Sequence, residues 1–126
     1  MVYAPLPVEL PDRGRYAHGA ELVPDETAAP APADVGAVVT AALCGHWEHE
    51  GPCRWPNNHS TVASGDSWTY LVLFVAPPFE ERELRERIEE ALATDNRWRV
   101  VRSGPRDIAP EEHELADRLA ATPRRS

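Results

Sequence analysis

The side chains best suited to chemistry are concentrated in one short segment of the chain, residues 44–59. It contains both cysteines and three of the five histidines: Cys44, His46, His49, Cys53 and His59. Thiolate and imidazole groups are the ligands that Zn²⁺ prefers in proteins. Cys44 and His46 would point the same way from a regular strand, and a turn at Gly51 and Pro52 could bring Cys53 back toward them. The segment therefore predicts a candidate zinc site.

Two other interpretations of this segment remain open. The spacing of the five donors matches no standard zinc finger or zinc ribbon, so the metal prediction rests on residue types alone. Cys44 and Cys53 could instead form a disulfide, although a reducing cytoplasm works against one. In the third interpretation Cys44 is a small buried apolar residue, Cys53 has no role, and the histidines belong to a polar loop. The metal content of the purified protein separates the first interpretation from the other two.

The segment also contains residue types that catalysis could use. Cys53 would serve as the thiol nucleophile, His49 or His59 as the base, and Asp66 as the orienting carboxylate. In a metal-assisted hydrolysis, His46, His49 and Cys53 would hold the metal, and Glu48 or Glu50 would act as the base. The chain lacks a glycine-rich nucleotide loop, a HExxH helix and a G-x-S-x-G turn. A small metal- or thiol-dependent enzyme is therefore the alternative prediction rather than the first.

Three tryptophans and one arginine lie in or near the segment: Trp47, Arg54, Trp55 and Trp68. Tryptophan and arginine are over-represented at binding hot spots, so these residues predict a contact surface. The alternative is a small cluster that anchors a long loop. If Trp55→Ala weakened a complex without loss of stability, the contact surface would be favoured; a large loss of stability would favour the anchor. His18 and His113 stand alone in the sequence and are expected at the surface.

Composition limits the classes of function. The chain has 126 residues, the size of one small domain, with 21 acidic residues, 13 basic residues and a net charge of −8. Because no basic stripe is present, we expect no binding to nucleic acid or to an anionic membrane. No apolar stretch is long enough to span a membrane, and residues 1–15 do not resemble a secretion signal. We therefore expect a soluble cytoplasmic protein. Its basic residues are all arginine, which is typical of a bacterium with GC-rich DNA.

The hydrophobic pattern divides the chain into an arm, one domain and a short tail. Residues 1–34 are rich in proline and alanine and are expected to form an irregular arm, either disordered or packed on the sheet. Residues 35–121 are expected to form a single α+β domain, and residues 122–126 a tail. Within the domain the patterns predict a strand at 35–47, a long connection at 48–66, a strand at 67–76, a helix at 79–94, a strand at 97–103 ended by Gly104 and Pro105, and a helix at 110–121.

The strand at 67–76 is apolar on both sides. Trp68, Tyr70, Val72 and Phe74 would point one way, and Leu71, Leu73 and Val75 the other. Such a strand usually lies inside a sheet that is covered on both faces. The following helix would join the strand at 67–76 to a parallel strand at 97–103 through a crossover. The strand at 35–47 would pair antiparallel with the strand at 67–76. The expected fold is a small mixed sheet of about three strands in the order β-β-α-β-α, with its helices on one face.

Two helices on one face leave the other face of the sheet open. That face would carry Leu71, Leu73 and Val75, together with Val38 of the first strand. It would need the N-terminal arm, a second copy of the chain or a partner to cover it. We therefore expect a non-enzymatic binding or accessory module that engages a protein partner, or a second copy of itself, through this face and the segment 44–59. The acidic charge also suits an inhibitor or immunity-type protein of a basic target, which is a further alternative.

Overall fold

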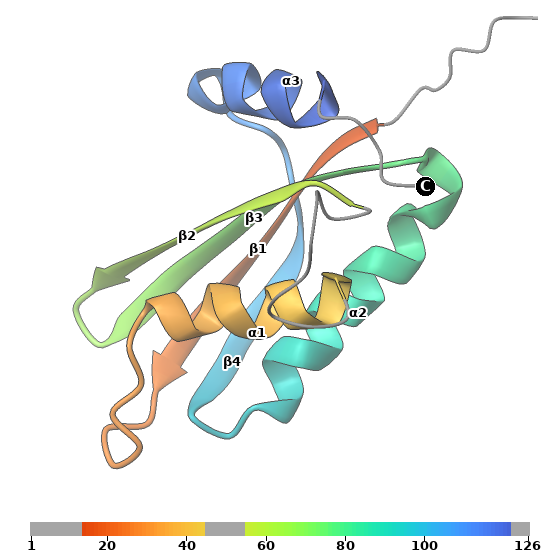
Figure 1. The fold of residues 1–126 in the computed structure, drawn as a ribbon. Coiled ribbons are helices and arrows are strands. Elements are labelled where there is room, and N and C mark those ends of the chain that lie inside the picture. The colour runs from red at the N-terminus through yellow and green to blue at the C-terminus, as the bar shows by residue number, and fades with distance from the viewer. Residues whose placement is uncertain (1–13, 45–54, 122–126) are drawn as a thin grey trace, which may run out of the picture.

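The computed structural model describes residues 14–44 and 55–121 (Figure 1). In chain order its elements are β1 (Gly14–Pro24), α1 (Ala33–Cys44), β2 (Asn57–Ser64), β3 (Ser67–Ala76), the 3-10 helix η1 (Pro78–Glu80), α2 (Glu81–Thr94), β4 (Trp98–Arg106), the 3-10 helix η2 (Pro110–Glu112) and α3 (His113–Ala121). The prediction of an α+β fold is confirmed, and the described residues form four strands in place of about three.

The strands form one open sheet in the order β2-β3-β1-β4, and every neighbouring pair is antiparallel. Up to β4 the chain follows the order β-α-β-β-α-β, which is the split βαβ or ferredoxin-like arrangement. β3 and β4 both run antiparallel to β1, so they run parallel to each other, as predicted. They are not neighbours, however, because β1 lies between them. The predicted mixed sheet is therefore wrong for the described strands, because every neighbouring pair is antiparallel.

The strand β1 occupies residues for which composition predicts an irregular arm. It pairs with β3 on one side and with β4 on the other. Its sequence, GRYAHGAELVP, has two glycines and one β-branched residue, so its own strand propensity is low. Hydrogen bonding on both sides and the burial of side chains such as Leu22 outweigh that propensity. The arm prediction is wrong for residues 14–24, and residues 1–13 lie outside the described part of the chain.

The predicted first strand, residues 35–47, is wrong: its described part belongs to the helix α1. Val35, Val39 and Leu43 recur at helical spacing, and all three are buried. The β-branched residues favour a strand locally. A helix, however, places this stripe of side chains against the core, and tertiary burial of this kind overrides weak local propensity.

The edge strand β2 lies inside the predicted long connection. Its sequence, NNHSTVAS, is polar, and only one side of it is even partly buried, so no apolar alternation marks it as a strand. A two-residue turn joins it to β3, since Ser64 pairs with Ser67. Gly65 in this turn has a φ of 62°, which suits the first position of a type II′ hairpin turn. Hairpin geometry, rather than hydrophobic burial, places β2 at the edge.

Three predicted elements agree closely with the structure. β3 spans the predicted residues 67–76, the helix predicted at 79–94 is η1 followed by α2, and the helix predicted at 110–121 is η2 followed by α3. β4 begins at Trp98, one residue after the predicted start, but it continues past the predicted end to Arg106. The proline within it, Pro105, is tolerated because β4 is an edge strand.

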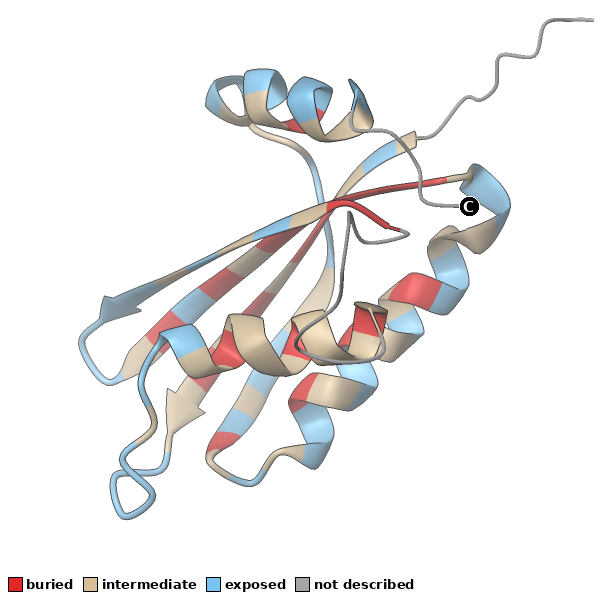
Figure 2. Cartoon of the chain, viewed as in Figure 1, coloured by how far each residue is buried: buried red, intermediate tan, exposed pale blue. Residues whose placement is uncertain are grey.

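The helices lie on both faces of the sheet. α1 and α2 cover what we call the first face and enclose the main core (Figure 2). The side chains that β3 contributes to this core are Trp68, Tyr70, Val72, Phe74 and Ala76. α3 packs against β1 and β3 on the opposite, second face, where Leu73 is 2% and Val75 0% exposed. The prediction that the helices share one face is therefore wrong for α3. Within the described ranges, no helix has the length and apolar character that crossing a membrane requires.

Candidate functional site

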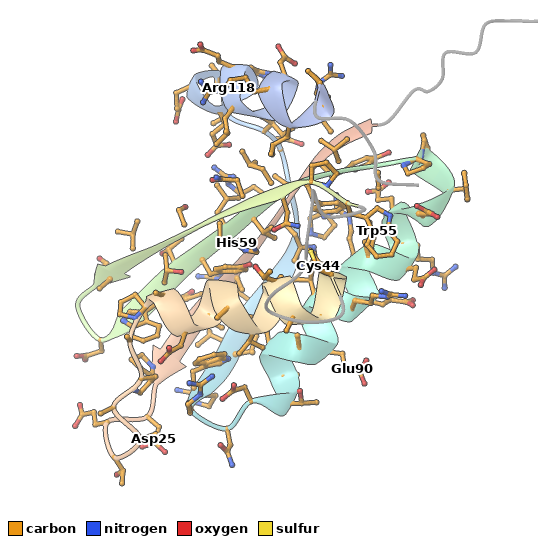
Figure 3. The ribbon with its side chains drawn as sticks, viewed as in Figure 1. Asp25, Cys44, Trp55, His59, Glu90 and Arg118 are labelled. Carbon is orange, nitrogen blue, oxygen red and sulfur yellow. The ribbon has the colours of Figure 1, made fainter. Side chains whose placement is uncertain are left out.

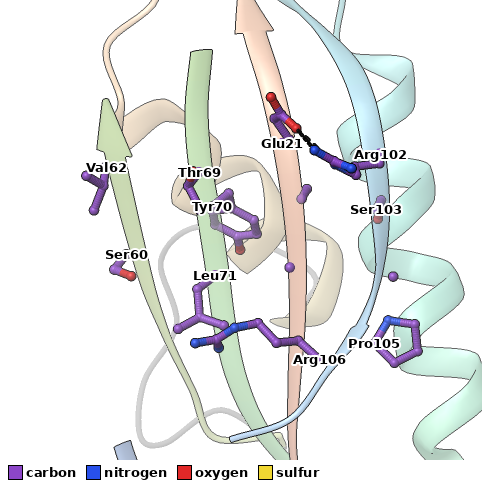
Figure 4. A pocket seen from close by; sticks show the side chains of 13 residues that line it. Glu21, Ser60, Val62, Thr69, Tyr70, Leu71, Arg102, Ser103, Pro105 and Arg106 are labelled. Atoms are coloured by element: carbon purple, nitrogen blue, oxygen red, sulfur yellow. Dashed lines mark hydrogen bonds and ion pairs between the residues drawn. The ribbon is translucent and has the colours of Figure 1, made fainter. Parts of the chain in front are cut away.

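The second face is covered by α3 only at one end. Beyond α3, the strands leave a hollow of about 630 Å³, which we call the sheet hollow (Figure 4). Its lining includes Gly19, Glu21, Leu71, Arg102, Gly104 and Arg106. Ligand pockets in proteins commonly have volumes of about 300 to 1,000 Å³. The sheet hollow is therefore large enough to hold a small molecule.

Two glycines on neighbouring strands form the floor of the sheet hollow. Gly19 of β1 and Gly104 of β4 are paired in the register, and Leu71 of β3 is paired with Gly19 on its other side. Neither glycine has a positive φ. A Cβ atom on Gly104 would have nothing within 4 Å, and one on Gly19 would make ordinary contacts, the nearest at 3.5 Å from Arg106 Cδ. The fold itself therefore does not require glycine at either position.

Glycine inside a strand has a cost, roughly 0.5–1 kcal/mol of stability relative to alanine. It often marks a bulge, or a place where a ligand or another backbone approaches closely. The irregularity in the β1–β4 register lies between Glu21 and Leu22, away from the glycines. A bulge therefore does not explain them. We interpret the Gly19–Gly104 pair as the contact point at the centre of the sheet hollow.

Two arginines of β4 border the sheet hollow, and each is paired with a glutamate. Arg102 donates from Nε to Oε1 of Glu21 at 2.9 Å, and its side chain is 80% exposed. Arg106 donates to both carboxylate oxygens of Glu112, at 3.3 and 3.0 Å. These hydrogen bonds hold the pKa of Glu112 below its usual value. Arg106 thus forms a fixed wall between the sheet hollow and the helical turn that precedes α3.

On the first face, His59 is the centre of a polar chain at the edge of the core (Figure 3). Its Nδ1 lies 2.6 Å from the Tyr70 hydroxyl, and its Nε2 lies 2.7 Å from Asn57 Oδ1 and 2.9 Å from Thr40 Oγ1. Burial lowers the pKa of His59 to about 4, so the ring is neutral at pH 7. Because the Asn57 oxygen can only accept, Nε2–H donates to it and Nδ1 accepts from the Tyr70 hydroxyl. These bonds join β2 to α1 and β3.

His18 of β1 is fully buried, so the prediction of a surface histidine is wrong. Its Nδ1 lies 3.0 Å from Arg85 Nη1, and its Nε2 lies 3.1 Å from Ser103 Oγ and 3.3 Å from Glu89 Oε2. Burial, and then the charge of Arg85, lower the pKa of His18. A catalytic triad places hydroxyl and carboxylate on opposite ring nitrogens. Here both share Nε2, so the cluster is a structural one. His113 is exposed, as predicted.

The zinc site stays a prediction, because three of its five donors, His46, His49 and Cys53, lie outside the described residues. The contact candidates Trp47 and Arg54 also lie outside them. Cys44 is disulfide-bonded, and the chain has one other cysteine. Both ring nitrogens of His59 are engaged in hydrogen bonds. Within 14–44 and 55–121, no group of three His, Cys, Asp or Glu side chains could hold a metal ion. Of the three interpretations of the segment, the state of Cys44 favours the disulfide.

The predicted contact residues Trp55 and Trp68 lie in the main core, where they are 6% and 7% exposed. The Trp55 indole donates from Nε1 to Glu80 Oε1 at 2.8 Å. The Arg87 guanidinium lies over the same ring, 5.0 Å from its centroid. These contacts hold Trp55 against α2 and the turn before it. They favour the anchoring cluster over a contact surface.

On the second face, three predicted contact residues have different surroundings. Leu73 and Val75 are buried where α3 packs, whereas Leu71 lines the sheet hollow. Val38, expected on the same face, lies in α1 and packs against the main core. The face expected to be open is thus partly closed by the last helix of the chain itself.

Sequence reasoning misses Gly19, Gly104, Arg102 and Arg106 as site residues. One signal was present, because β4 carries three arginines and no acidic residue in a chain of net charge −8. The sequence pattern assigns Gly104 to the end of a strand and Gly19 to the irregular arm. Their pairing depends on the register between β1 and β4, which no local pattern contains.

Comparisons of the chain with protein-family models, with curated proteins and with solved structures find no match. Function is therefore inferred from the geometry and chemistry of the site.

Proposed function

We propose that this protein is a non-enzymatic binding module, and that the sheet hollow is where it binds a small organic ligand. The observation that carries the proposal is the Gly19–Gly104 pair, whose backbone forms the floor; this floor is open over Gly104 and is crossed by the stem of Arg106 over Gly19. An aromatic or aliphatic group placed on the open part would contact the backbone at Gly104 and the aliphatic stem of Arg106. Burial of such a group is favourable by about 25 cal/mol for each Å² of apolar surface removed from water.

The chemistry of the lining supports binding rather than catalysis. The described residues around the sheet hollow include no histidine and no cysteine, which are the usual general base and the most reactive nucleophile. The floor is strand backbone, and β1 is hydrogen-bonded to a neighbouring strand on each side. The floor therefore has a fixed shape, which lowers the entropic cost of binding.

A fragment screen by ¹H–¹⁵N NMR on the full chain tests the proposal. Ligands are expected to shift the amide signals of Gly19 and Gly104, which are readily resolved because glycine amides have characteristic nitrogen shifts. The variant Gly104→Leu fills open space, so it is expected to keep the fold and to weaken binding at least about tenfold, or about 1.4 kcal/mol.

Val101→Leu is the matched control, because Val101 lies on the same strand, is 45% exposed and is outside the sheet hollow. It is expected to bind as the parent protein does. The proposal is wrong if fragments that bind the parent protein bind Gly104→Leu equally well, or if no fragment shifts the two glycine signals.

A protein partner on the same face, as the sequence predicts, is the second candidate. Val62 favours it, because this residue is 61% exposed on the edge strand β2 and borders the sheet hollow. A second copy is a poor partner on charge, since each chain carries −8. Light scattering on the parent protein and on Val62→Asp measures self-association, and a dimer that Val62→Asp dissolves would favour this candidate.

A further inference from the structure

The strand that borders the sheet hollow carries a net positive charge in this acidic protein. β4 has three arginines, Arg99, Arg102 and Arg106, and no acidic residue, whereas the chain as a whole has a net charge of −8. Arg99 is paired with Val23, Arg102 with Glu21 and Arg106 with Ala17, which places all three on the second face. The sheet hollow itself is lined by two arginines and one glutamate.

Arg106 lies over one part of the glycine floor, and Arg102 also lines the sheet hollow. The stem of Arg106 crosses Gly19, with Cδ at 3.5 Å from where a Cβ would be, and its guanidinium is fixed by Glu112. Arg102 is held by Glu21. A guanidinium has five N–H donors, and the glutamate in each pair accepts two of them. Each arginine therefore has further donors for a ligand.

We infer that the ligand of the sheet hollow is an amphipathic organic anion. Its flat apolar body would lie on Gly104 and against the aliphatic stem of Arg106, which crosses Gly19, and its carboxylate, sulfonate or phosphate would bind Arg106 and Arg102. This inference rests on the proposed function, since it names the ligand class of the same site. The bidentate geometry of arginine suits these anions in particular.

The existing ion pairs do not prevent such binding. The Arg102–Glu21 pair is largely exposed on the arginine side, with 80% of that side chain accessible, and exposed pairs contribute little stability. Replacing the Glu21 carboxylate on Arg102 by a ligand anion therefore costs little free energy. The Arg106–Glu112 pair has a different role, because it keeps the stem of Arg106 in place beside the floor.

Two fluorescent probes that differ by a single sulfonate group test the inference. The anion 8-anilinonaphthalene-1-sulfonate and the neutral N-phenyl-1-naphthylamine have the same aromatic body, and both brighten in apolar surroundings. The anionic probe is expected to bind the full chain about tenfold more tightly, and its affinity is expected to fall with salt. The neutral probe should show no salt dependence.

Charge variants locate the anion. Arg102→Gln and Arg106→Gln are each expected to weaken the binding of the anionic probe about fivefold or more. Neither variant is expected to change the binding of the neutral probe. Arg99→Gln is the matched control, because it removes the same charge from the same strand and face but lies outside the sheet hollow. Arg102 is exposed, so its variant remains informative even if loss of the Arg106–Glu112 pair loosens α3.

The outcomes separate this inference from the proposed function. If both probes bind equally and Gly104→Leu weakens both, the sheet hollow binds ligands but not anions, and the inference is overturned while the proposed function stands. If Gly104→Leu changes neither probe, both are overturned. If light scattering shows a dimer that Gly104→Leu converts to monomer, the occupant is a second copy, and the inference is again overturned.

Discussion

The Tyr70 hydroxyl donates a hydrogen bond of 2.6 Å to Nδ1 of His59, and Nδ1 can accept it only while that nitrogen carries no proton. Asn57 accepts from the opposite side of the ring, over 2.7 Å. The two bonds together hold the imidazole in one neutral tautomer. The edge strand β2 is thereby fixed on β3 by a contact that depends on protonation.

We expect stability to fall as the pH is lowered from 6.5 to 4. The pKa of His59 is about 4 in the folded protein, against an ordinary value of 6.5, so the unfolded state takes up the proton first. The contribution of neutral His59 to the free energy of unfolding is complete above pH 6.5. It is lost as the pH falls through the folded pKa, and the loss amounts to about 3 kcal/mol. Urea unfolding measured at several pH values reports it.

His59→Gln is expected to flatten part of this pH dependence. The remainder should come from His18, whose pKa is also lowered by burial, and from Asp95 and Glu112, whose pKa values are lowered by hydrogen bonds from Arg97 and Arg106. NMR titration of the His59 ring gives an independent check. If the ring titrates near 6.5 in the folded protein, the buried tautomer described above is wrong.

A charge at Ala116 should detach α3 from the sheet. Ala116 is 1% exposed on the face of α3 that meets β1 and β3, so Ala116→Asp buries an unpaired carboxylate and is expected to cost about 2–3 kcal/mol. Detachment would expose Leu73 and Val75. Light scattering is then expected to show self-association that increases with concentration.

Ala121→Asp places the same charge on the exposed end of α3 and serves as the control for Ala116→Asp. It is expected to change stability by less than about 1 kcal/mol. Equal behaviour of the two variants would mean that α3 does not cover the second face.

Trp55 is expected to be an anchor for stability. Trp55→Ala should lower the free energy of unfolding by about 3–5 kcal/mol, as for other buried aromatic residues. Trp55→Phe keeps most of the packing and loses the hydrogen bond to Glu80, so the free energy of unfolding is expected to fall by about 1 kcal/mol. Glu80→Gln keeps an acceptor and should cost less. Unchanged stability of Trp55→Ala, with a weaker ligand complex, would instead support a contact surface.

Reduction should distinguish the disulfide from the predicted zinc site. Cys44 is disulfide-bonded, so the untreated protein is expected to be lighter than the reduced protein by two hydrogen atoms in intact mass spectrometry. Reduction, or Cys44→Ser, should lower stability by about 2–3 kcal/mol, and a chelator should have no effect. Zinc bound at one ion per chain, with stability unaffected by a reductant, would support the metal site.

Local sequence signals were sufficient for the elements whose environment agrees with their own pattern. The strand at 67–76 is apolar on both sides, and the structure covers both sides, so its limits were predicted correctly. The helix α2 follows two prolines and carries a buried stripe of Leu84, Ile88 and Leu92. In these elements propensity, periodicity and burial all indicate the same structure.

The tertiary structure decided the remaining elements and the site. Residues 14–24 and 57–64 have weak strand signals, and they are strands because β3 and β4 provide their hydrogen-bonding partners. The valines of α1 favour a strand locally, and burial against the core makes them helical. The sheet hollow exists because register brings Gly19 beside Gly104. A register between distant strands is a property of the assembled sheet, so sequence patterns alone could supply the glycines but not their pairing.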